Sequence, residues 1–580
     1  MNSTMSDNLL LAGVLWPLLC TCLFAFRATT PLALTLAPWG ALPALAAGFL
    51  AGQGEVRMSF LLLGSELGLD ATGQSFLLST ALLWLLAGVF ARGYFGQSDR
   101  QPCFYALFLL TMAGNLLLVI SLDGLSFYLG FALMSFAAYG LVIFDSNAAA
   151  FRAGRVYILL VVLGEAMILV ALLLAAKTAG STSFAAIRDS LGTAETGPLV
   201  IALALVGFGI KAGLLGLHVW MPLAYTSAPI PASAVLAGAM INAGLLGWVH
   251  LLPLGENAFP VAASVFLILG LVTAFYGVAV GLFQRNPKTV LAYSSMSQMG
   301  IMSAAIGVGL IAPSAWALLL PAVVFYAVNH GLSKGTLFLG LGFADNDFRM
   351  RWRWAWIALW LPALSLAGAP FTSGMLAKSQ MKAQFLQAPE PWEAALHVLI
   401  PVSSLATAIL MARLLYLVRP VPDAQSASPA WALAWPWFLA LVSVAFSAWW
   451  FVPQMPLLDM KAIMDTLWPV LASAAIALIV LRWGLFRGAP SIPAGDNLIW
   501  VESGLEALCR AWRQQLAVIS SQKLAFQRLS ARVPVLAEAA SAALGRTEAR
   551  LTRWRVAAQL VILIILAASL MASPVWTSLR

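Results

Sequence analysis

The sequence predicts an all-α membrane protein that crosses the bilayer many times. Hydrophobic residues make up 61% of its 580 residues and charged residues only 9%, which is more apolar surface than a soluble domain can bury. These residues gather in runs of roughly 20, long enough to cross a hydrocarbon core of about 30 Å. Lysine and arginine are also distributed unevenly between alternate connecting segments, as the positive-inside rule describes.

The apolar runs predict about sixteen spans. The first run has no basic segment before it and no small-residue cleavage site, so we interpret it as a retained span rather than a signal peptide. The expected spans lie near 8–27, 31–52, 74–95, 104–121, 124–144, 156–176, 198–221, 232–253, 258–283, 289–311, 314–343, 354–377, 393–418, 431–452, 465–486 and 557–575.

The basic residues predict the orientation of these spans. The net charge of +9 could suggest a nucleic-acid partner, but most of the charge lies in the short loops of one side. Placing the N-terminus outside puts those loops on the inner side, as the positive-inside rule requires. We therefore expect a multi-pass protein of a bacterial inner membrane, with the lipid bilayer and not a nucleic acid as its partner.

The cysteines argue against a redox centre in this chain. There are four, and none stands in a CxxC or a Cys/His spacing typical of zinc, haem or iron–sulfur sites. No glycine-rich nucleotide fingerprint follows a strand. We expect neither a metal nor a cofactor, so any electron transfer would take place in another subunit.

The chain divides by composition into six parts. Two middle parts hold five spans each, and because five is odd the second enters the membrane from the opposite side, which makes an inverted repeat typical of ion-coupled transporters. The predicted parts are N-terminal spans at 1–103, a first half-channel at 104–253, a second half-channel at 258–418, additional spans at 419–486, an amphipathic segment at 487–556 and a final span at 557–580.

The amphipathic segment differs from everything before it. It contains charged residues throughout, and its apolar residues recur at helical spacing in LEALCRAWRQQLAVISSQKLAFQRL. Such a helix lies along a membrane surface or against neighbouring helices. A small cytoplasmic domain is the competing interpretation, although the segment is short for a core of its own.

Lys211 is the first candidate for ion transfer, because it lies near the centre of an apolar span. An ionisable side chain there costs roughly 2.5–3.5 kcal/mol and persists mainly where it faces a bundle interior or a water path. Glu165 is the only carboxylate well inside a span of the first half, and a pairing with Lys211 is expected. A static ion pair that only orients helices is the alternative.

A second set of candidates follows one helix face. Tyr326, His330 and Lys334 are spaced by four residues, so they form a polar stripe along an apolar helix. Histidine readily exchanges protons near neutral pH, which favours a proton relay. A structural lysine beside a hydrogen-bonded histidine is the alternative.

Proline marks two spans as broken helices. Lys211 is followed by Pro222 and Lys378 is preceded by Pro370, and proline leaves backbone carbonyls that need other partners. Hydropathy also allows Lys378 to extend to the interface. His218, one turn before Pro222, either belongs to the same path or bonds a freed carbonyl.

Two further polar residues complete the candidates. Asn242 is a weaker polar residue of the path, and His250, near the end of a span, is expected at the interface.

Four segments resemble a known family. They are GFGIKAGLLGLHVWMPLA, APIPASAVLAGAMINAG, RNPKTVLAYSSMSQMGIM and NHGLSKGTLFLG, and they resemble the antiporter-like, proton-translocating subunits of respiratory complex I, of Mrp-type cation/proton antiporters and of group-4 membrane-bound hydrogenases such as formate hydrogenlyase. The resemblance covers roughly residues 100–420, and the forms LHVWMP and SAVLAGAMI are closer to the hydrogenase-associated branch.

The resemblance implies a role for each candidate. Lys211 matches the lysine of the broken seventh span, His330 and Lys334 match the pair of the eleventh, and Lys378 matches the terminal residue of the broken twelfth. It also implies that each half forms a half-channel and that 487–575 corresponds to a lateral helix with a final span.

The sequence also departs from the family pattern. The fifth-span glutamate that would pair with the seventh-span lysine is replaced by Ala132, and Asn242 stands where the eighth span has a lysine or histidine. Tyr326 occupies a position where some members have a histidine. Either Glu165 replaces the missing acid, or the first half no longer conducts protons.

These observations favour an ion-translocating membrane subunit of a multisubunit energy-converting or antiporter-like complex. The ion is expected to be the proton, with Na⁺ as an alternative, and the partners are other membrane subunits. A partner-binding scaffold with a degenerate first half is one competing function. A subunit that uses the proton gradient in a non-redox cation or inorganic-carbon transport complex is another.

Overall fold

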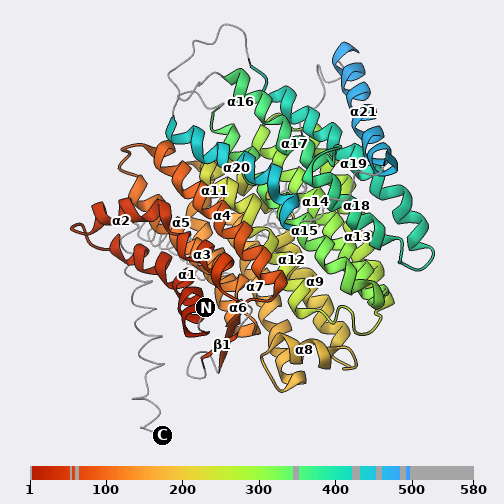
Figure 1. Ribbon diagram of the computed structural model, residues 1–580, viewed down its shortest axis with the longest axis horizontal. Helices are drawn as coiled ribbons and strands as arrows, with labels where there is room; N and C mark the ends of the chain where they lie inside the picture. Colours follow the sequence, from red (N-terminus) through yellow and green to blue (C-terminus); the bar gives the residue numbers. More distant parts are fainter. Residues whose placement is uncertain are drawn as a thin grey trace, which may run out of the picture.

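The computed structural model describes residues 3–52, 55–58, 64–343, 352–420, 431–451, 460–483 and 492–496. Within these ranges the chain is helical apart from one two-stranded hairpin, and the helices pack side by side as one bundle (Figure 1). Thirteen helical segments of the described residues are long and apolar enough to cross a membrane. The chain is therefore an all-α polytopic membrane protein, as the sequence predicts.

The N-terminal part contains four helices and the hairpin. The strands pair antiparallel, with Glu55 opposite Gly68, and Asp123 accepts a hydrogen bond from the backbone of Glu66 at 2.9 Å. Asp123 also caps the helix that follows it, so it fixes the hairpin to the bundle. The elements are α1 (Ser3–Leu23), α2 (Thr30–Leu36), the 3₁₀ turn η1 (Ala37–Trp39), α3 (Leu42–Leu50), β1 (Glu55–Met58), β2 (Ser65–Gly68) and α4 (Ala71–Phe95).

The first expected half-channel contains the most irregular helices. One of its spans is broken between α9 and α10, and another contains a π-helical turn, η2. The elements are α5 (Gln101–Val119), α6 (Gly124–Val142), α7 (Ala148–Ala179), α8 (Phe184–Leu191), α9 (Gly197–Ala212), α10 (Trp220–Ser227), α11 (Ile230–Val235), η2 (Leu236–Met240) and α12 (Asn242–Leu251).

The second expected half-channel has a break between α17 and α18. In the described part of the chain, the two apolar helices α20 and α21 follow this half-channel. The elements are α13 (Pro260–Leu282), α14 (Pro287–Ile311), the 3₁₀ turn η3 (Pro313–Ala315), α15 (Trp316–Leu341), α16 (Trp352–Ala358), α17 (Trp360–Ala367), α18 (Ser373–Phe385), α19 (Trp392–Leu417), α20 (Trp431–Phe451) and α21 (Met460–Trp483).

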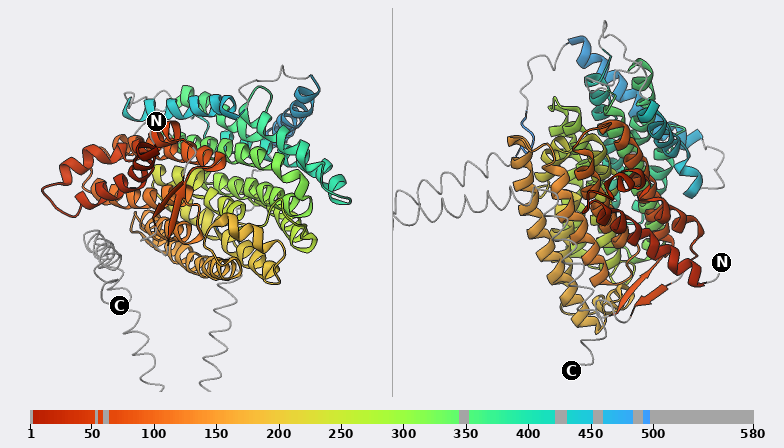
Figure 2. Two further views of the ribbon diagram at one scale, coloured as in Figure 1. Left: turned by 60° about the horizontal axis from the view of Figure 1, so that its bottom comes forward. Right: turned by 90° about the vertical axis from the view of Figure 1, so that its left-hand side faces the viewer.

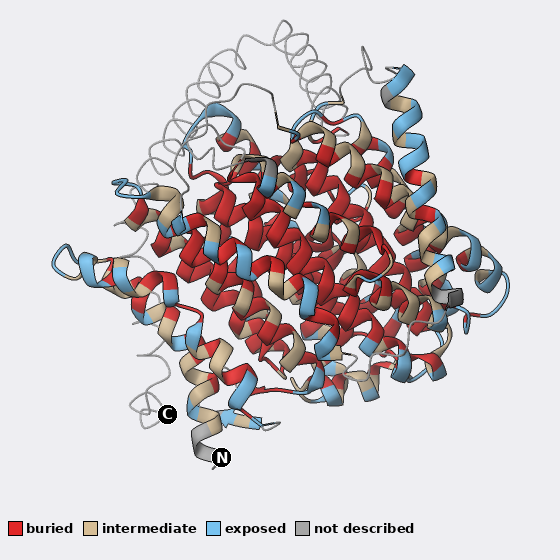
Figure 3. Cartoon of the chain, turned by 45° about the horizontal axis from the view of Figure 1, so that its top comes forward, coloured by how far each residue is buried: buried red, intermediate tan, exposed pale blue. Residues whose placement is uncertain are grey.

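Burial separates the inner helices from the outer ones. The segment from α11 to α12 is completely buried and α14 is 94% buried, whereas α21 is only 11% buried. Figure 3 shows this as a red interior with pale blue on the outermost helices. Large apolar side chains such as Leu159 and Val261 are exposed on those helices, which suits contact with lipid rather than water.

The hairpin and α8 lie together at the lower edge of the bundle in Figure 1, and the strands stand beside the lower helix ends in the right-hand view of Figure 2. Backbone bonds join β2 to the end of α5, where Gly68 donates to Ile120 at 2.8 Å. An isolated bridge between Asp123 and Ser183 joins this region to the start of α8. We call this end of the bundle the hairpin face.

Fifteen of the expected spans have a helical counterpart among the described residues. Thirteen are long helical segments, and the spans near 198–221 and 354–377 correspond to the shorter apolar helices Gly197–Ala212 and Trp354–Ala367. They are short because both are broken near a lysine, as the prolines predict. The expected span at 557–575 and nearly all of the amphipathic segment lie outside the described residues, and the division into inverted repeats stays a prediction.

Candidate functional site

Lys211 lies where α9 is interrupted. The helix ends at Ala212, and Gly213 follows in the left-handed conformation with φ of +73°, which favours glycine because it has no Cβ. The carbonyl of Ile210 accepts a hydrogen bond from the backbone N–H of Gly213 at 3.2 Å and a second hydrogen bond from Nε1 of Trp220 at 2.7 Å. The break therefore holds the Lys211 side chain, which is 4% exposed, at the end of a helix inside the bundle.

Aromatic rings and one hydroxyl surround the Lys211 ammonium. Its Nζ donates to Oγ of Ser135 on α6 at 3.3 Å. The nitrogen also lies 5.5 Å from the ring centre of Phe131 and 6.0 Å from that of Trp220, within the range of cation–π attraction. Ser135 is one helical turn after Ala132, so a hydroxyl on the same helix supports the lysine where the family pattern has a carboxylate.

Glu165 reaches the same region from α7. The side chain is 3% exposed and interacts electrostatically with Lys211. The two do not form one of the ion pairs within 4.0 Å found among the described residues. Neither carboxylate oxygen has a hydrogen-bond partner in that part of the chain, although Ser135 lies close enough to influence it. The expected pairing is therefore indirect, with Ser135 beside both groups.

His218 is bound by a residue from far along the chain. Its Nε2 lies 3.1 Å from Oδ1 of Asp496, and Tyr276 of α13 donates a hydrogen bond to the other carboxylate oxygen. His218 is completely buried and Asp496 is 8% exposed. The sequence predicts either a place in the path or a bond to a freed carbonyl for His218. Its Nε2 contacts a carboxylate rather than a carbonyl, and a place in the path stays a prediction.

Asn242 lies where the two expected halves meet. The π-helical turn η2 precedes it, and its Gly238 approaches Gly331 of α15 so closely that a Cβ on either residue would meet the other's carbonyl oxygen within 2.5 Å. Asn242 Nδ2 donates to the carbonyls of Gly238 at 3.3 Å and Ala327 at 3.5 Å. π-helical turns are frequent at functional sites, and this one brings a polar side chain against α15.

His330 and Lys334 are both buried in the middle of α15. Lys334 is completely inaccessible, and its Nζ donates to the carbonyl of Leu291 on α14 at 2.8 Å. Both ring nitrogens of His330 are buried, and within the described ranges they have no hydrogen-bond partner. Buried polar atoms of this kind are usually satisfied by internal water.

Tyr326 continues this face of α15 toward α19. Its hydroxyl donates to Oε1 of Gln298 on α14, and Gln298 Nε2 donates to Oγ1 of Thr407 on α19 at 3.0 Å. The predicted stripe of Tyr326, His330 and Lys334 therefore lies within buried polar side chains and carbonyls of α14 and α19.

Lys378 follows the second helix break. Its Nζ donates to the carbonyl of Ala367, the last residue of α17, at 3.1 Å and to Oγ of Ser404 at 3.4 Å. The side chain thus returns to the broken helix instead of extending to the interface as hydropathy allows. Asn329 of α15 fixes the same break, because its Oδ1 accepts hydrogen bonds from Ser365 at 2.8 Å and Ser373 at 2.9 Å.

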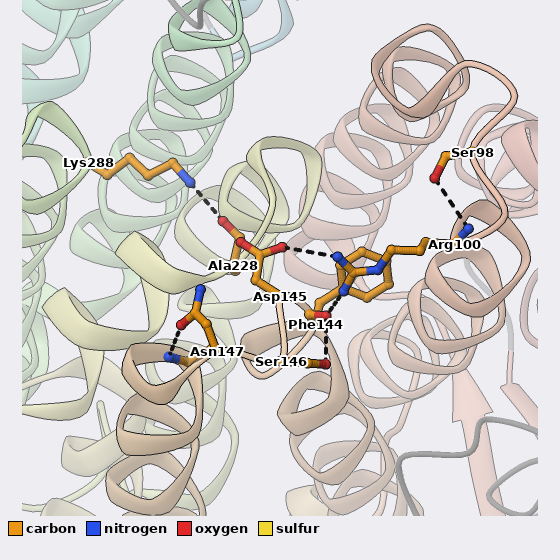
Figure 4. A network of polar contacts seen from close by, with 9 residues as sticks. Ser98, Arg100, Phe144, Asp145, Ser146, Asn147, Ala228 and Lys288 are labelled. Carbon is orange, nitrogen blue, oxygen red and sulfur yellow. Dashed lines mark hydrogen bonds and ion pairs between the residues drawn. The ribbon is translucent and has the colours of Figure 1, made fainter.

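Basic residues anchor the helix ends away from the hairpin face. Lys288 donates to the carbonyl of Ala228 at 2.7 Å, just before α11 (Figure 4). In the same figure Arg100 reaches the carbonyl of Phe144 and lies 3.9 Å from Asp145. These contacts hold neighbouring loops together at that end of the bundle.

The structure adds polar residues that the sequence does not single out. Ser135, Gln298 and Asn329 connect the buried lysine and histidine helices to their neighbours. Asn329 could have been identified from the sequence, because it adjoins His330 in the NHGLSKG segment. No sequence feature distinguishes Ser135. Asp496 falls in the segment expected to lie along the membrane surface, so its contact with His218 has no counterpart in the sequence pattern.

Several known proteins are similar in sequence to this chain. Residues 121–404 match the transmembrane family described as NADH:quinone oxidoreductase/Mrp antiporter. Hydrogenase-4 component B of Escherichia coli is 27% identical over 289 residues, which are 48% of this chain and 43% of that protein. F(420)H(2) dehydrogenase subunit N of Methanosarcina mazei is 25% identical over 442 residues, or 72% of this chain and 88% of that protein.

Two solved structures have the same fold. A chain of the Mrp complex from Dietzia sp. DQ12-45-1b superposes with a TM-score of 0.72 at 20% identity, over 93% of this chain and 63% of that one. A chain of the membrane-bound sulfane sulfur reductase, an archaeal respiratory membrane complex, gives 0.64 at 17% identity, over 81% of this chain and 99% of that one. Through residues 121–404 the chain is similar to the membrane subunits of NADH:quinone oxidoreductases and Mrp antiporters.

Proposed function

We propose that this chain moves protons across the membrane as one subunit of a larger energy-converting or antiporter-like complex. Other membrane subunits would drive the movement, and the complex would lie in the plasma membrane of a bacterium. The protons would pass along Glu165, Lys211, Asn242 with water, His330, Lys334 and Lys378, with His218 and Tyr326 beside the path.

The observation that carries this proposal is the burial of Lys211 and Lys334 in helices that are otherwise apolar. Each is less than 5% exposed, and an ionisable group at mid-membrane costs roughly 2.5–3.5 kcal/mol, so such groups mark ion paths. The ring nitrogens of His330 and Oδ1 of Asn242, which have no partner within the described residues, fit a water-filled path between the two lysines.

The electrostatics of the first half supports coupled movement. Lys211 and Glu165 interact while Ser135 separates them from a direct ion pair. A proton leaving the Lys211 ammonium removes the charge that stabilises the carboxylate, so the protonation states of the two groups depend on each other. Charge could spread from this pair toward α15 in the same way.

A partner-binding scaffold remains the second candidate, and one observation favours it. Ala132 replaces the expected glutamate, and Lys211 is fixed by Ser135 and two aromatic rings, which also suits a static structural lysine. In that case the second half alone would conduct protons, or neither would.

Proton flux into vesicles that contain the whole complex tests the proposal. We expect Lys211→Ala and Lys334→Ala to lower flux while the complex stays assembled. Lys177→Ala is the matched control, because Lys177 is an exposed lysine near the end of α7. Normal flux in both buried-lysine variants would refute proton movement through the chain. Flux measured with Na⁺ present and absent distinguishes H⁺ from Na⁺ as the moving ion.

A further inference from the structure

A cavity opens at the hairpin face of the first half. Its volume is about 390 Å³, and its charged and titratable lining consists of Glu55, Glu66, Asp70, Arg188 and His250. The hairpin supplies two of these carboxylates, the start of α4 supplies the third, α8 supplies the arginine and α12 supplies the histidine. Three carboxylates around a water-accessible space attract cations.

Arg188 ties the cavity to the end of α12. Its guanidinium donates to the carbonyl of His250 at 3.3 Å. Burial lowers the pKa of Arg188, while the neighbouring carboxylates of Asp70, Asp189 and Glu256 oppose that effect. The arginine therefore holds the floor of the cavity in place within an acidic environment.

His250 is the polar group at the floor of the cavity. It is 5% exposed, so it is buried rather than interfacial, contrary to the sequence expectation. The ring stacks on Phe184 with centroids 5.0 Å apart. Its Nε2 has no hydrogen-bond partner within the ranges that the structure describes. A buried imidazole nitrogen beside a cavity can exchange a proton with water there.

Three phenylalanine rings separate His250 from Lys211. Phe127 and Phe131 of α6 and Phe208 of α9 are buried and lie 5.9 to 6.1 Å from one another. Phe127 meets the His250 ring at 6.0 Å, and Phe131 meets the Lys211 ammonium at 5.5 Å. We call these three rings the phenylalanine layer.

We propose that the cavity is the proton outlet of the first half at the hairpin face, with His250 as its proton carrier and the phenylalanine layer as a hydrophobic gate. The proposal rests on the function proposed above. When the layer parts, a proton passes from the Lys211 ammonium through water to Nε2 of His250 and then to water in the cavity, leaving Lys211 neutral. When the layer is closed, its apolar rings exclude water and prevent a leak.

Passive leak tests the gate without any driving reaction. A pH gradient is imposed on vesicles that contain the assembled complex, and its decay is recorded for Phe127→Ala/Phe131→Ala. We expect decay at least about tenfold faster than in the unmodified complex, because small side chains let water reach Lys211. The matched control is Phe104→Ala/Phe108→Ala, two buried and stacked rings on α5. Equal decay in both double variants would overturn the proposal.

The route of the leak is tested by adding a third substitution. His250→Gln in the Phe127→Ala/Phe131→Ala background should return the leak toward the control, because glutamine cannot carry a proton. A leak that His250→Gln does not change would overturn the role of His250. If the double variant does not assemble, His250→Gln by itself should lower driven proton flux at unchanged amounts of complex, and unchanged flux would again overturn the outlet.

The outlet and the proposed function fail in different measurements. If Lys211→Ala abolishes driven flux while the gate variants leak no more than the control, the function stands and the outlet is wrong. If the gate variants leak through His250 while Lys211→Ala and Lys334→Ala pump normally, the outlet stands as a path and the proposed function is wrong.

Discussion

The two buried lysines differ in what stabilises their charge. Lys211 has a hydroxyl at 3.3 Å, two aromatic rings and an interacting carboxylate, Glu165, within the first half. Lys334 is completely buried and donates to a backbone carbonyl at 2.8 Å, and no carboxylate of the described residues forms an ion pair with it. The first half therefore places a carboxylate near its lysine, while the lysine of the second half is supported by a backbone carbonyl.

This difference teaches how each half can hold a proton. A lysine with a nearby carboxylate is stabilised as an ion, so its proton leaves when the carboxylate is neutralised or displaced. The charged form of a buried lysine is stabilised less when only carbonyls support it, so small changes in its surroundings decide whether it is charged. We therefore expect proton transfer in the second half to respond more strongly to substitutions than proton transfer in the first half.

The largest effect should follow Lys334→Ala. Removing the group that transfers the proton should lower driven flux on the order of 100-fold, measured in vesicles with the assembled complex. Since no ion-paired carboxylate among the described residues is left behind, assembly should be unchanged. Lys334→Arg keeps the charge but holds its proton too firmly to exchange, and flux that returns with arginine would argue for a structural lysine.

The next largest effect is on the stability of the complex, and it distinguishes the two halves. Lys211→Ala leaves the buried Glu165 carboxylate without its cation, so the complex should lose about 1–3 kcal/mol of stability, seen as a lower unfolding temperature. Adding Glu165→Gln should restore most of that loss, because the uncompensated charge is gone. No such rescue is expected for Lys334→Ala. Additive losses from Lys211→Ala and Glu165→Gln would show that the two groups are not coupled.

Sequence patterns identify buried ionisable residues better than the uncharged polar residues that contact them. Lys211, His330 and Lys334 stand out because an ionisable residue interrupts an apolar run. Pro370 lies within the second break, and Pro222 lies in the first turn of the helix that follows the first break. Ser135 and Gln298 do not stand out, because small and polar residues occur throughout membrane helices for packing reasons. Their roles depend on which helices meet, and that is a property of the fold.

Two features lie beyond local patterns altogether. The π-helical turn η2 falls in SAVLAGAMI, which has the composition of an ordinary apolar helix. The contact of Asp496 with His218 joins residues 278 positions apart. Neither periodicity nor spacing carries information over that range, so both features require the structure.

A third prediction concerns the Asp496 contact, which joins His218 of the first half to Tyr276 of the second. Asp496→Asn keeps the size of the side chain but removes the charge that faces His218 and Tyr276. If His218 lies beside the path, driven flux should fall by about fivefold, because a charge-assisted hydrogen bond is replaced by a neutral one that is weaker by about 1 kcal/mol. Asp465→Asn, in the half-exposed ion pair with Lys382, is the control. Unchanged flux with a weakened complex would assign Asp496 a structural role alone.

The smallest effect should follow Ser135→Ala, and it tests the first half most directly. The hydroxyl that accepts from Lys211 is removed while the ammonium and the carboxylate both stay, so the pair can approach more closely and offset the lost bond. We expect driven flux to fall only about twofold, since the lost hydrogen bond and the gained attraction are each about 1 kcal/mol. Ser126→Ala is the matched control, a buried serine on the same helix whose hydroxyl has no partner within the described chain. A loss as large as that of Lys211→Ala would mean that Ser135 itself relays the proton, so that the first half has replaced its missing fifth-span acid with a hydroxyl and not with Glu165.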